Sequence, residues 1–181
     1  QLAEEITLGE LYITKNKGDL KPGSTDREII ERYSLLTLYY STTTPTAKWK
    51  NQMNWQRNDK NICEGWYNVG CKEIQEDSNN SQTKTQVVTE LVLKDNGLVG
   101  TIPDELAHLS SLETLHLESN ELEGKVPISL GELKELRSLR LSFNKLTGKF
   151  PDKICSLNTN ALLSEIEVSC ANLECKCCEC L

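Results

Sequence analysis

The chain repeats itself every 24 residues. From Val88 to about Thr159 it falls into three rows that align without a gap. The recurring columns hold Leu91, Leu115 and Leu139; Leu93, Leu117 and Leu141; Asn96, Asn120 and Asn144; Leu98, Leu122 and Leu146; Gly100, Gly124 and Gly148; and Pro103, Pro127 and Pro151. A regular period of about 20–50 residues is typical of a solenoid.

Each column has a structural reason. Alternating leucines predict a short strand with one buried face, because side chains alternate sides along a strand. An Asn amide offers both a donor and an acceptor, so stacked Asn residues can form a ladder that satisfies backbone groups in the turn after each strand. Glycine permits backbone angles that a side chain forbids, and proline suits an extended return. The last apolar columns predict a short helical turn, and each coil needs its neighbours to bury its leucines.

The row L-x-x-L-x-L-x-x-N-x-L-x-G-x-I-P-x-x-L-x-x-L-x-x resembles the plant-type leucine-rich repeat, which occurs in receptor ectodomains and secreted inhibitors. The strict match covers residues 88–159. The resemblance implies an α/β solenoid, a short right-handed leucine-rich-repeat coil with a cap at each end.

The segment before the repeats, residues 25–87, is predicted to be an N-terminal cap. A capping box at residues 25–28 opens a helix, and apolar residues then recur along one side of it. That side contains Ile29, Ile30, Tyr33, Leu36 and Tyr40. Three tryptophans follow, Trp49, Trp55 and Trp66. Residues 72–86 are predicted to form a polar excursion before the first repeat strand.

The stretch CEGWYNVGC, from Cys63 to Cys71, resembles the C-x-W-x-G-V-x-C motif of the cap in secreted plant-type repeats. It has one extra residue, and Asn68 stands where glycine is usual. The resemblance implies a disulfide between the two cysteines. The amino-acid sequence of the predicted cap helix and the closely spaced C-terminal cysteines also resemble those of secreted repeat proteins from stramenopile algae such as diatoms.

Residues 160–181 are predicted to be a cysteine-rich C-terminal cap, in which Ile166 and Val168 mark an imperfect last strand. The six cysteines outside the first pair are Cys155, Cys170, Cys175, Cys177, Cys178 and Cys180. Their C-x-C-C-x-C run admits a soft metal bound by thiolates or a set of disulfides. We favour disulfides and no metal, because the tail has no histidine and its cysteines are not arranged as the separate C-x-x-C pairs of a structural zinc site. Fifteen pairings remain open.

The cysteine content indicates an oxidising compartment, secreted or lumenal. A start at Gln1 without a leader fits a chain whose signal peptide has been removed. The sequon at Asn79 is a candidate glycosylation site, and residues 1–24 read as an N-terminal arm. A net charge of −7 without a cluster of cations argues against nucleic acid. No apolar stretch is long enough to span a bilayer.

No catalytic motif stands out. The two histidines are His108, expected on the outer side of the first repeat, and His116, expected to point out from its strand. Nucleophile elbows, zinc-protease motifs and phosphate-binding loops are missing from the sequence. We therefore expect no enzyme and no cofactor.

The variable positions beside the strand leucines are the candidate contact residues. Those predicted to bind a partner on the concave sheet face are Val92, Lys94, Thr114, His116, Glu118, Arg140, Ser142 and Phe143, with Glu165 and Glu167 extending the series. An exposed Phe or Arg is a typical interface anchor. The alternative is that Lys94–Glu118 and Arg140–Glu167 are neighbouring surface ion pairs that contribute little to stability and bind no partner.

The sequence thus predicts a non-enzymatic module that binds a protein, either as a recognition protein or as an accessory structural subunit of a larger complex. The alternative is a secreted protein that binds glycan or cell wall, in which Trp49, Trp55 or Phe143 would make the contact.

Overall fold

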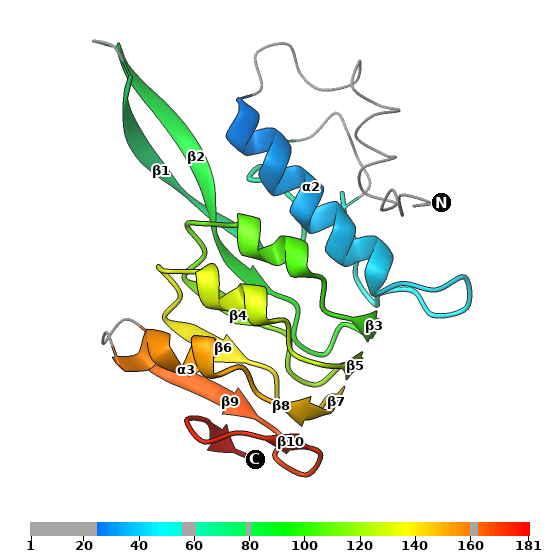
Figure 1. Cartoon of the computed structure of the whole chain (residues 1–181). Coiled ribbons are helices and arrows are strands. Elements are labelled where there is room, and N and C mark those ends of the chain that lie inside the picture. Colours follow the sequence, from blue (N-terminus) through cyan, green and yellow to red (C-terminus); the bar gives the residue numbers. More distant parts are fainter. Residues whose placement is uncertain (1–24, 56–60, 79–80, 160–162) are drawn as a thin grey trace, which may run out of the picture.

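The computed structural model describes residues 25–55, 61–78, 81–159 and 163–181, in which the repeats form a solenoid of stacked coils (Figure 1). The predicted arm, residues 1–24, and the predicted glycosylation site, Asn79, lie outside these residues. Each coil has a strand on one side and a short helix on the other, in the order that the repeat pattern predicts.

The strand side is a six-stranded sheet with the order β1-β2-β4-β6-β9-β11. The first pair is antiparallel and the later pairs are parallel. The strands span Val69–Ser78 (β1), Ser81–Val92 (β2), Thr114–His116 (β4), Ser138–Arg140 (β6), Glu165–Val168 (β9) and Glu179–Cys180 (β11). Leu91, Leu115 and Leu139 pair side by side, because the chain returns to the same position after every 24 residues.

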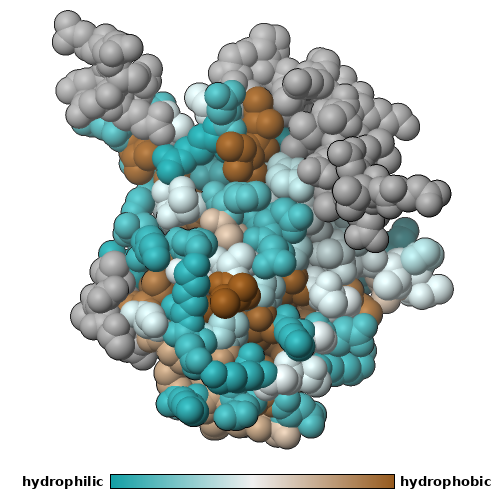
Figure 2. Space-filling view, in the orientation of Figure 1, coloured by the Kyte–Doolittle hydropathy of each residue, from teal (hydrophilic) through white to brown (hydrophobic). Residues whose placement is uncertain are grey.

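The other side of each coil carries a short helix. Two 3₁₀ helices, η1 (Asp104–His108) and η2 (Ile128–Glu132), are followed by the α-helix α3 (Asp152–Thr159). The chain between strand and helix forms a three-stranded sheet of β3 (Val99–Thr101), β5 (Glu121–Gly124) and β7 (Lys145–Leu146). Figure 2 shows a largely hydrophilic surface in this orientation, with apolar colour in separate spots.

The repeat leucines form one continuous core. The nine leucines of the three leucine columns are between 0% and 5% exposed. The apolar residues before the prolines, Ile102, Val126 and Phe150, are also buried, at 4%, 4% and 1%. The same core includes the three tryptophans that precede the repeats, so the N-terminal segment and the repeats share one hydrophobic interior.

Helix α2 (Asp26–Ser41) packs against the first coil through η1 and β3 (Figure 1). Thr25 Oγ1 accepts a hydrogen bond from the Glu28 backbone N–H at 3.2 Å. The predicted buried side is wrong in part, because Ile30 is 46% exposed whereas Leu35 and Leu38 are fully buried. Helix α2 lies between the first coil and the tryptophan cluster, so more than one side of it is covered.

Two charged side chains of α2 are buried, which no sequence pattern predicted. Glu31 is 1% exposed and accepts a hydrogen bond from the Val88 backbone N–H at 3.2 Å. Burial raises the pKa of the Glu31 carboxyl to about 7, although the Val88 hydrogen bond and the charge of Arg27 act in the opposite direction. Arg32 is 5% exposed, and its guanidinium carbon lies 5.2 Å from the centre of the Trp66 ring.

The segment between α2 and the first repeat is held by aromatic packing and a disulfide. Trp49, Trp55 and Trp66 are at most 3% exposed, and neighbouring ring centres lie 4.6 and 5.2 Å apart. Cys63 pairs with Cys71. Asn68, at the position where glycine is usual, has a φ of 56° and donates from Nδ2 to Val92 O at 2.7 Å. Asn is one of the few residues with a side chain that tolerates this conformation.

The predicted polar excursion at residues 72–86 is largely regular structure. β1 and β2 pair in register from Val69 to Leu91, with one irregularity at Gly70 and Cys71. Figure 1 shows the resulting hairpin projecting beyond the stacked coils. The first repeat strand is therefore the second arm of a hairpin.

The C-terminal segment continues both sheets. The predicted imperfect strand is β9, and β11 then pairs with it. β10 (Leu173–Glu174) pairs with β8 (Gly148–Lys149) on the other side of the coil. Three disulfides hold this segment, Cys155–Cys177, Cys170–Cys180 and Cys175–Cys178. The tail is thus a partial further coil as well as a cysteine-bonded end.

Candidate partner-binding face

The residues between the buried leucines stand in two straight rows on the outer surface of the six-stranded sheet. The strand register places Glu90, Thr114, Ser138 and Glu165 in one row, and Val92, His116, Arg140 and Glu167 in the other. We call these eight residues, together with Phe143, the sheet face. The strands hold them about 4.8 Å apart along each row, so neighbouring side chains interact directly.

Arg140 is the centre of a charged network. Its Nη2 lies 2.6 Å from Glu165 Oε1 and its Nε lies 3.9 Å from Glu167 Oε2. The predicted partner of Arg140 was Glu167, but Glu165 is the closer one. Hydrogen bonds from Ser138 and Arg140 lower the pKa of the Glu165 carboxyl, so Glu165 is ionised at neutral pH. Since both acids come from β9, the network depends on the coil that follows the strict repeats.

His116 joins this network through a serine. Its Nε2 lies 2.7 Å from Ser138 Oγ, and Ser138 Oγ donates to Glu165 Oε2 at 2.5 Å. Burial lowers the pKa of the His116 imidazole, although nearby acidic residues partly oppose this effect. The imidazole is therefore neutral at pH 7. Because the serine proton points toward Glu165, Nε2 must be the donor in its contact with Ser138.

Two predicted contact residues are not available at the surface. Glu118 is 4% exposed and Ser142 is fully buried. Both lie two residues after the end of a strand. Lys94 Nζ lies 3.6 Å from Glu118 Oε1, and Ser142 Oγ donates to Glu167. Among the described residues, Glu118 Oε2 has no hydrogen-bond partner.

Phe143 is the most unusual residue of the sheet face. Its side chain is 60% exposed, and its backbone φ is 53°, in the left-handed region. The equivalent residues of the other coils, Asp95 and Ser119, have φ values of 46° and 58°. The turn therefore imposes this conformation on every coil, and only the third coil places an aromatic residue there. The Phe143 backbone N–H donates to Ser169 Oγ at 2.7 Å.

The three predicted ladder residues lie beneath this edge of the sheet. Asn120 Oδ1 accepts from the backbone N–H groups of Asn96 and Leu98, at 3.0 and 3.1 Å. Its Nδ2 donates to the carbonyl groups of Leu93 and Leu117, both at 2.9 Å. Asn144 repeats the pattern one coil later, and Asn96 bonds to the cap segment at Asn51 instead. The ladder thus joins the N-terminal segment, at Asn51, to the coils that carry the sheet face.

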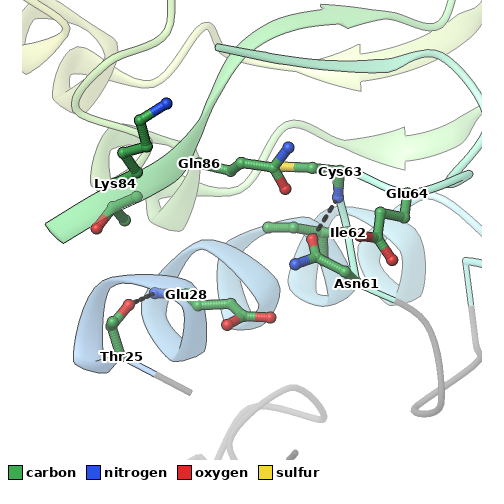
Figure 3. Close-up of a pocket in the computed structure, with 9 residues that line it drawn as sticks. Thr25, Glu28, Asn61, Ile62, Cys63, Glu64, Lys84 and Gln86 are labelled. Carbon is green, nitrogen blue, oxygen red and sulfur yellow. Dashed lines mark hydrogen bonds between the residues drawn. The ribbon is translucent and has the colours of Figure 1, made fainter. Parts of the chain in front are cut away.

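A separate cleft of about 380 Å³ opens between the start of α2, strand β2 and the loop before Cys63 (Figure 3). Its lining is mainly polar and consists of Thr25, Glu28, Asn61, Ile62, Cys63, Glu64, Lys84, Thr85 and Gln86. The predicted capping box contributes Thr25 and Glu28, and the predicted cysteine motif contributes Cys63 and Glu64. Asn61 Oδ1 and Thr25 Oγ1 already accept backbone hydrogen bonds within the cap, so these two side chains have structural roles there.

The described residues contain no helix with the length and apolar character needed to cross a bilayer.

Comparisons with known proteins identify the repeat. Residues 86–146 match the family described as Leucine rich repeat. A search of curated proteins finds no match. The leucine-rich-repeat ectodomain of the receptor kinase SOBIR1 from Arabidopsis thaliana is 26% identical, with a TM-score of 0.61 over 80% of this chain and 68% of that one.

Two further Arabidopsis ectodomains are similar. That of the receptor kinase HAESA, in complex with an IDA peptide hormone ligand, is 27% identical with a TM-score of 0.59, over 82% of this chain and 22% of that one. The ectodomain of BIR2 is 26% identical with a TM-score of 0.50, over 84% of both chains. This chain therefore spans about a fifth of the HAESA ectodomain.

These comparisons support the predicted resemblance to plant-type repeats, whereas the resemblance to stramenopile proteins stays a prediction. Together with the disulfides, they point to an extracytoplasmic setting. The chain contains a leucine-rich-repeat solenoid of the kind found in the ectodomains of plant receptors.

Proposed function

We propose that this chain is a non-enzymatic leucine-rich-repeat module that binds a protein partner in an extracytoplasmic compartment, with the sheet face as the binding surface. The observation that carries the proposal is Phe143. A phenyl ring that is 60% exposed gains little from folding, while its left-handed backbone costs about 1–2 kcal/mol. A residue kept at a cost to stability in an exposed position is a candidate for function.

The surroundings of Phe143 suit a protein interface. An aromatic ring and an arginine with carboxylate partners are typical of interface centres. Arg140 is already held by Glu165, so less side-chain freedom is lost when a partner binds. The HAESA ectodomain, which is similar in fold, was solved with a peptide ligand, which supports a protein or peptide as the partner class.

The Ser138–His116 contact argues against hydrolysis. In a Ser-His-Asp triad the carboxylate contacts the imidazole, and the imidazole takes the proton of the serine. Here the carboxylate of Glu165 contacts the serine instead. His116 then donates to Ser138 and cannot act as its general base. The arrangement orders the surface and does not activate a nucleophile.

We further propose that α2 and the tryptophan cluster act as the N-terminal cap of a right-handed coil, and that the cysteine-bonded tail acts as the C-terminal cap. Both ends of a solenoid would otherwise expose apolar residues. A recognition protein and an accessory subunit of a larger complex would use the same face, and they differ in whether the partner is bound permanently.

The glycan-binding alternative loses most of its proposed contacts. Trp49 and Trp55 are 3% and 0% exposed and pack in the cap, so they cannot stack on a sugar ring without unfolding it. Only Phe143 of the three residues remains accessible.

The proposal can be tested with a photo-crosslinking amino acid placed at residue 143. Ile128 of η2 gives a matched control, because it is 63% exposed but lies on the helix side. Each variant is incubated with native extract in the oxidised state, and cross-linked products are identified by mass spectrometry. A discrete protein cross-linked from residue 143 and not from residue 128 supports the sheet face. Equal cross-linking from both positions contradicts it.

A further inference from the structure

The two disulfides at the end of α3 lie against each other. Cys155 pairs with Cys177, and Cys175 pairs with Cys178. The Sγ atoms of Cys175 and Cys177, which belong to different disulfides, are 3.8 Å apart. The Sγ atoms of Cys155, Cys175 and Cys177 all lie within 4.8 Å of one another. Three sulfurs of two separate bonds are therefore close enough to exchange partners with little movement of the chain.

The two bonds constrain the chain to different degrees. Cys175 and Cys178 are 3 residues apart, whereas Cys155 and Cys177 are 22 residues apart. Opening Cys175–Cys178 frees a loop of only a few residues, whereas opening Cys155–Cys177 detaches the tail from α3. The shorter disulfide can thus open with less rearrangement of the fold.

Cys175, Cys177 and Cys178 are neither fully buried nor fully exposed, although they pack against the core. An incoming thiol can approach the short disulfide while the rest of the solenoid stays folded. By contrast, opening Cys63–Cys71 frees a loop beside the buried tryptophans.

We propose that the Cys175–Cys178 disulfide is an exchange site for a cysteine thiol, and that opening of this bond leads to opening of the Cys155–Cys177 disulfide. In the first step, an incoming thiolate attacks Cys178 Sγ. A mixed disulfide forms on Cys178, the Cys175–Cys178 bond breaks, and its electron pair leaves as the Cys175 thiolate. Access and the spacing of the sulfurs govern such exchange.

In the second step, the Cys175 thiolate attacks Cys177 Sγ, which lies 3.8 Å away. A Cys175–Cys177 bond forms, the Cys155–Cys177 bond breaks, and the negative charge moves to Cys155 on α3. Each step forms one S–S bond and breaks one, so no external oxidant or reductant is needed. The result is a covalent link to the incoming thiol at Cys178 and a free thiolate on the last helix.

This activity goes beyond reversible binding through the sheet face. It gives the C-terminal end of the solenoid a covalent route to a partner that carries a free cysteine. The Cys170–Cys180 disulfide serves as an internal control, because it lies in the same tail and includes the exposed Cys180 but contributes no sulfur to the cluster.

The test uses the intact oxidised protein and reduced glutathione as the thiol. After short incubations at increasing concentrations, free thiols are blocked with N-ethylmaleimide and the protein is digested with trypsin. Cleavage after Lys176 places Cys175 and Cys178 on different peptides, and fragment ions locate each label. The expected result is glutathione on Cys178 and maleimide on Cys155, whereas an opened Cys170–Cys180 bond carries glutathione and maleimide on its own two cysteines.

Three results would overturn the proposal. The first is a Cys175–Cys178 bond that stays closed at thiol concentrations that open Cys170–Cys180. The second is maleimide on Cys175 in place of Cys155, which would mean that the second step does not occur. The third is an untreated protein whose native mass corresponds to four free tail thiols and a bound zinc ion. A Cys155→Ser, Cys177→Ser double variant lacks the disulfide that the second step attacks. Provided that its far-UV circular dichroism spectrum matches that of the wild type, the maleimide must then be found on Cys175.

Discussion

Replacing Asn120 with alanine tests the ladder that joins the coils. In the described hydrogen bonds, Asn120 is the only partner for the N–H groups of Asn96 and Leu98 and for the carbonyl of Leu93. The carbonyl of Leu117 keeps its bond to Asn144. Three buried groups at about 1–3 kcal/mol each give a loss of about 3–9 kcal/mol. Water entering the vacated space favours the lower end of this range.

Asn144→Ala is the matched comparison, because Asn144 is half-buried and fewer groups depend on it. The described bonds leave only the Leu122 N–H and the Leu141 carbonyl without a partner in that variant. Urea unfolding of the oxidised protein, followed by far-UV circular dichroism, gives the free energy of unfolding for each variant. The loss should be clearly larger for Asn120→Ala. An unchanged midpoint, or equal losses in the two variants, would refute the reasoning.

Three further predictions concern the sheet face and the cap. Phe143→Asn should raise the thermal unfolding midpoint by relieving about 1 kcal/mol of backbone strain while it abolishes partner binding; a lower midpoint would mean that the ring packs. Gly100→Ala should destabilise more than Gly148→Ala, since both have positive φ but only the first places a Cβ 2.3 Å from Ser41 O; equal losses would exclude this clash. Glu31→Gln should reduce the dependence of the free energy of unfolding on pH.

The Glu31 effect has a defined sign. Its folded pKa of about 7 lies above the ordinary value of 4.5, so the folded state binds more protons than the unfolded state between these values. The stability contributed by the protonated carboxyl is complete below about pH 4.5 and is lost as pH rises through 7. The loss is about 2–3 kcal/mol. Unfolding in urea at pH 5 and pH 8 should show this difference in the wild type and a smaller one in the glutamine variant.

The repeat itself was predictable because 24 residues per coil is a constraint on backbone geometry. Every leucine in the three columns must face inward, and the strands must pair in register. The sequence therefore identified the strands, the helical turns and the positions of the asparagines without any knowledge of distant contacts. The sheet face followed from the same period, since residues between inward leucines must point outward.

The predictions of burial that were wrong concern residues whose surroundings come from segments far apart in the chain. The exposed side of α2 was misplaced because the position of the tryptophan cluster, which covers part of the helix, cannot be read from the helix sequence. Glu31 is buried by strand β2, 57 residues away. Likewise, Glu118 and Ser142 were expected at the surface, but side chains from neighbouring coils cover them. The repeat pattern predicts which side of the sheet a side chain points to, but it does not predict how much of that side chain is exposed.

The imperfect last coil explains why three strict repeats are not the whole binding surface. Arg140 lies on the third repeat strand, but its carboxylate partners, Glu165 and Glu167, lie on β9. The Phe143 backbone N–H also donates a hydrogen bond to this region, at Ser169 Oγ. The Cys155–Cys177 disulfide joins the tail to α3, and the tail continues the sheet beside β9, so the cysteines that close the end of the solenoid also set the geometry of the sheet face. Opening Cys155–Cys177 would loosen that attachment, and the proposed thiol exchange would then change binding at the sheet face as well as add a covalent link.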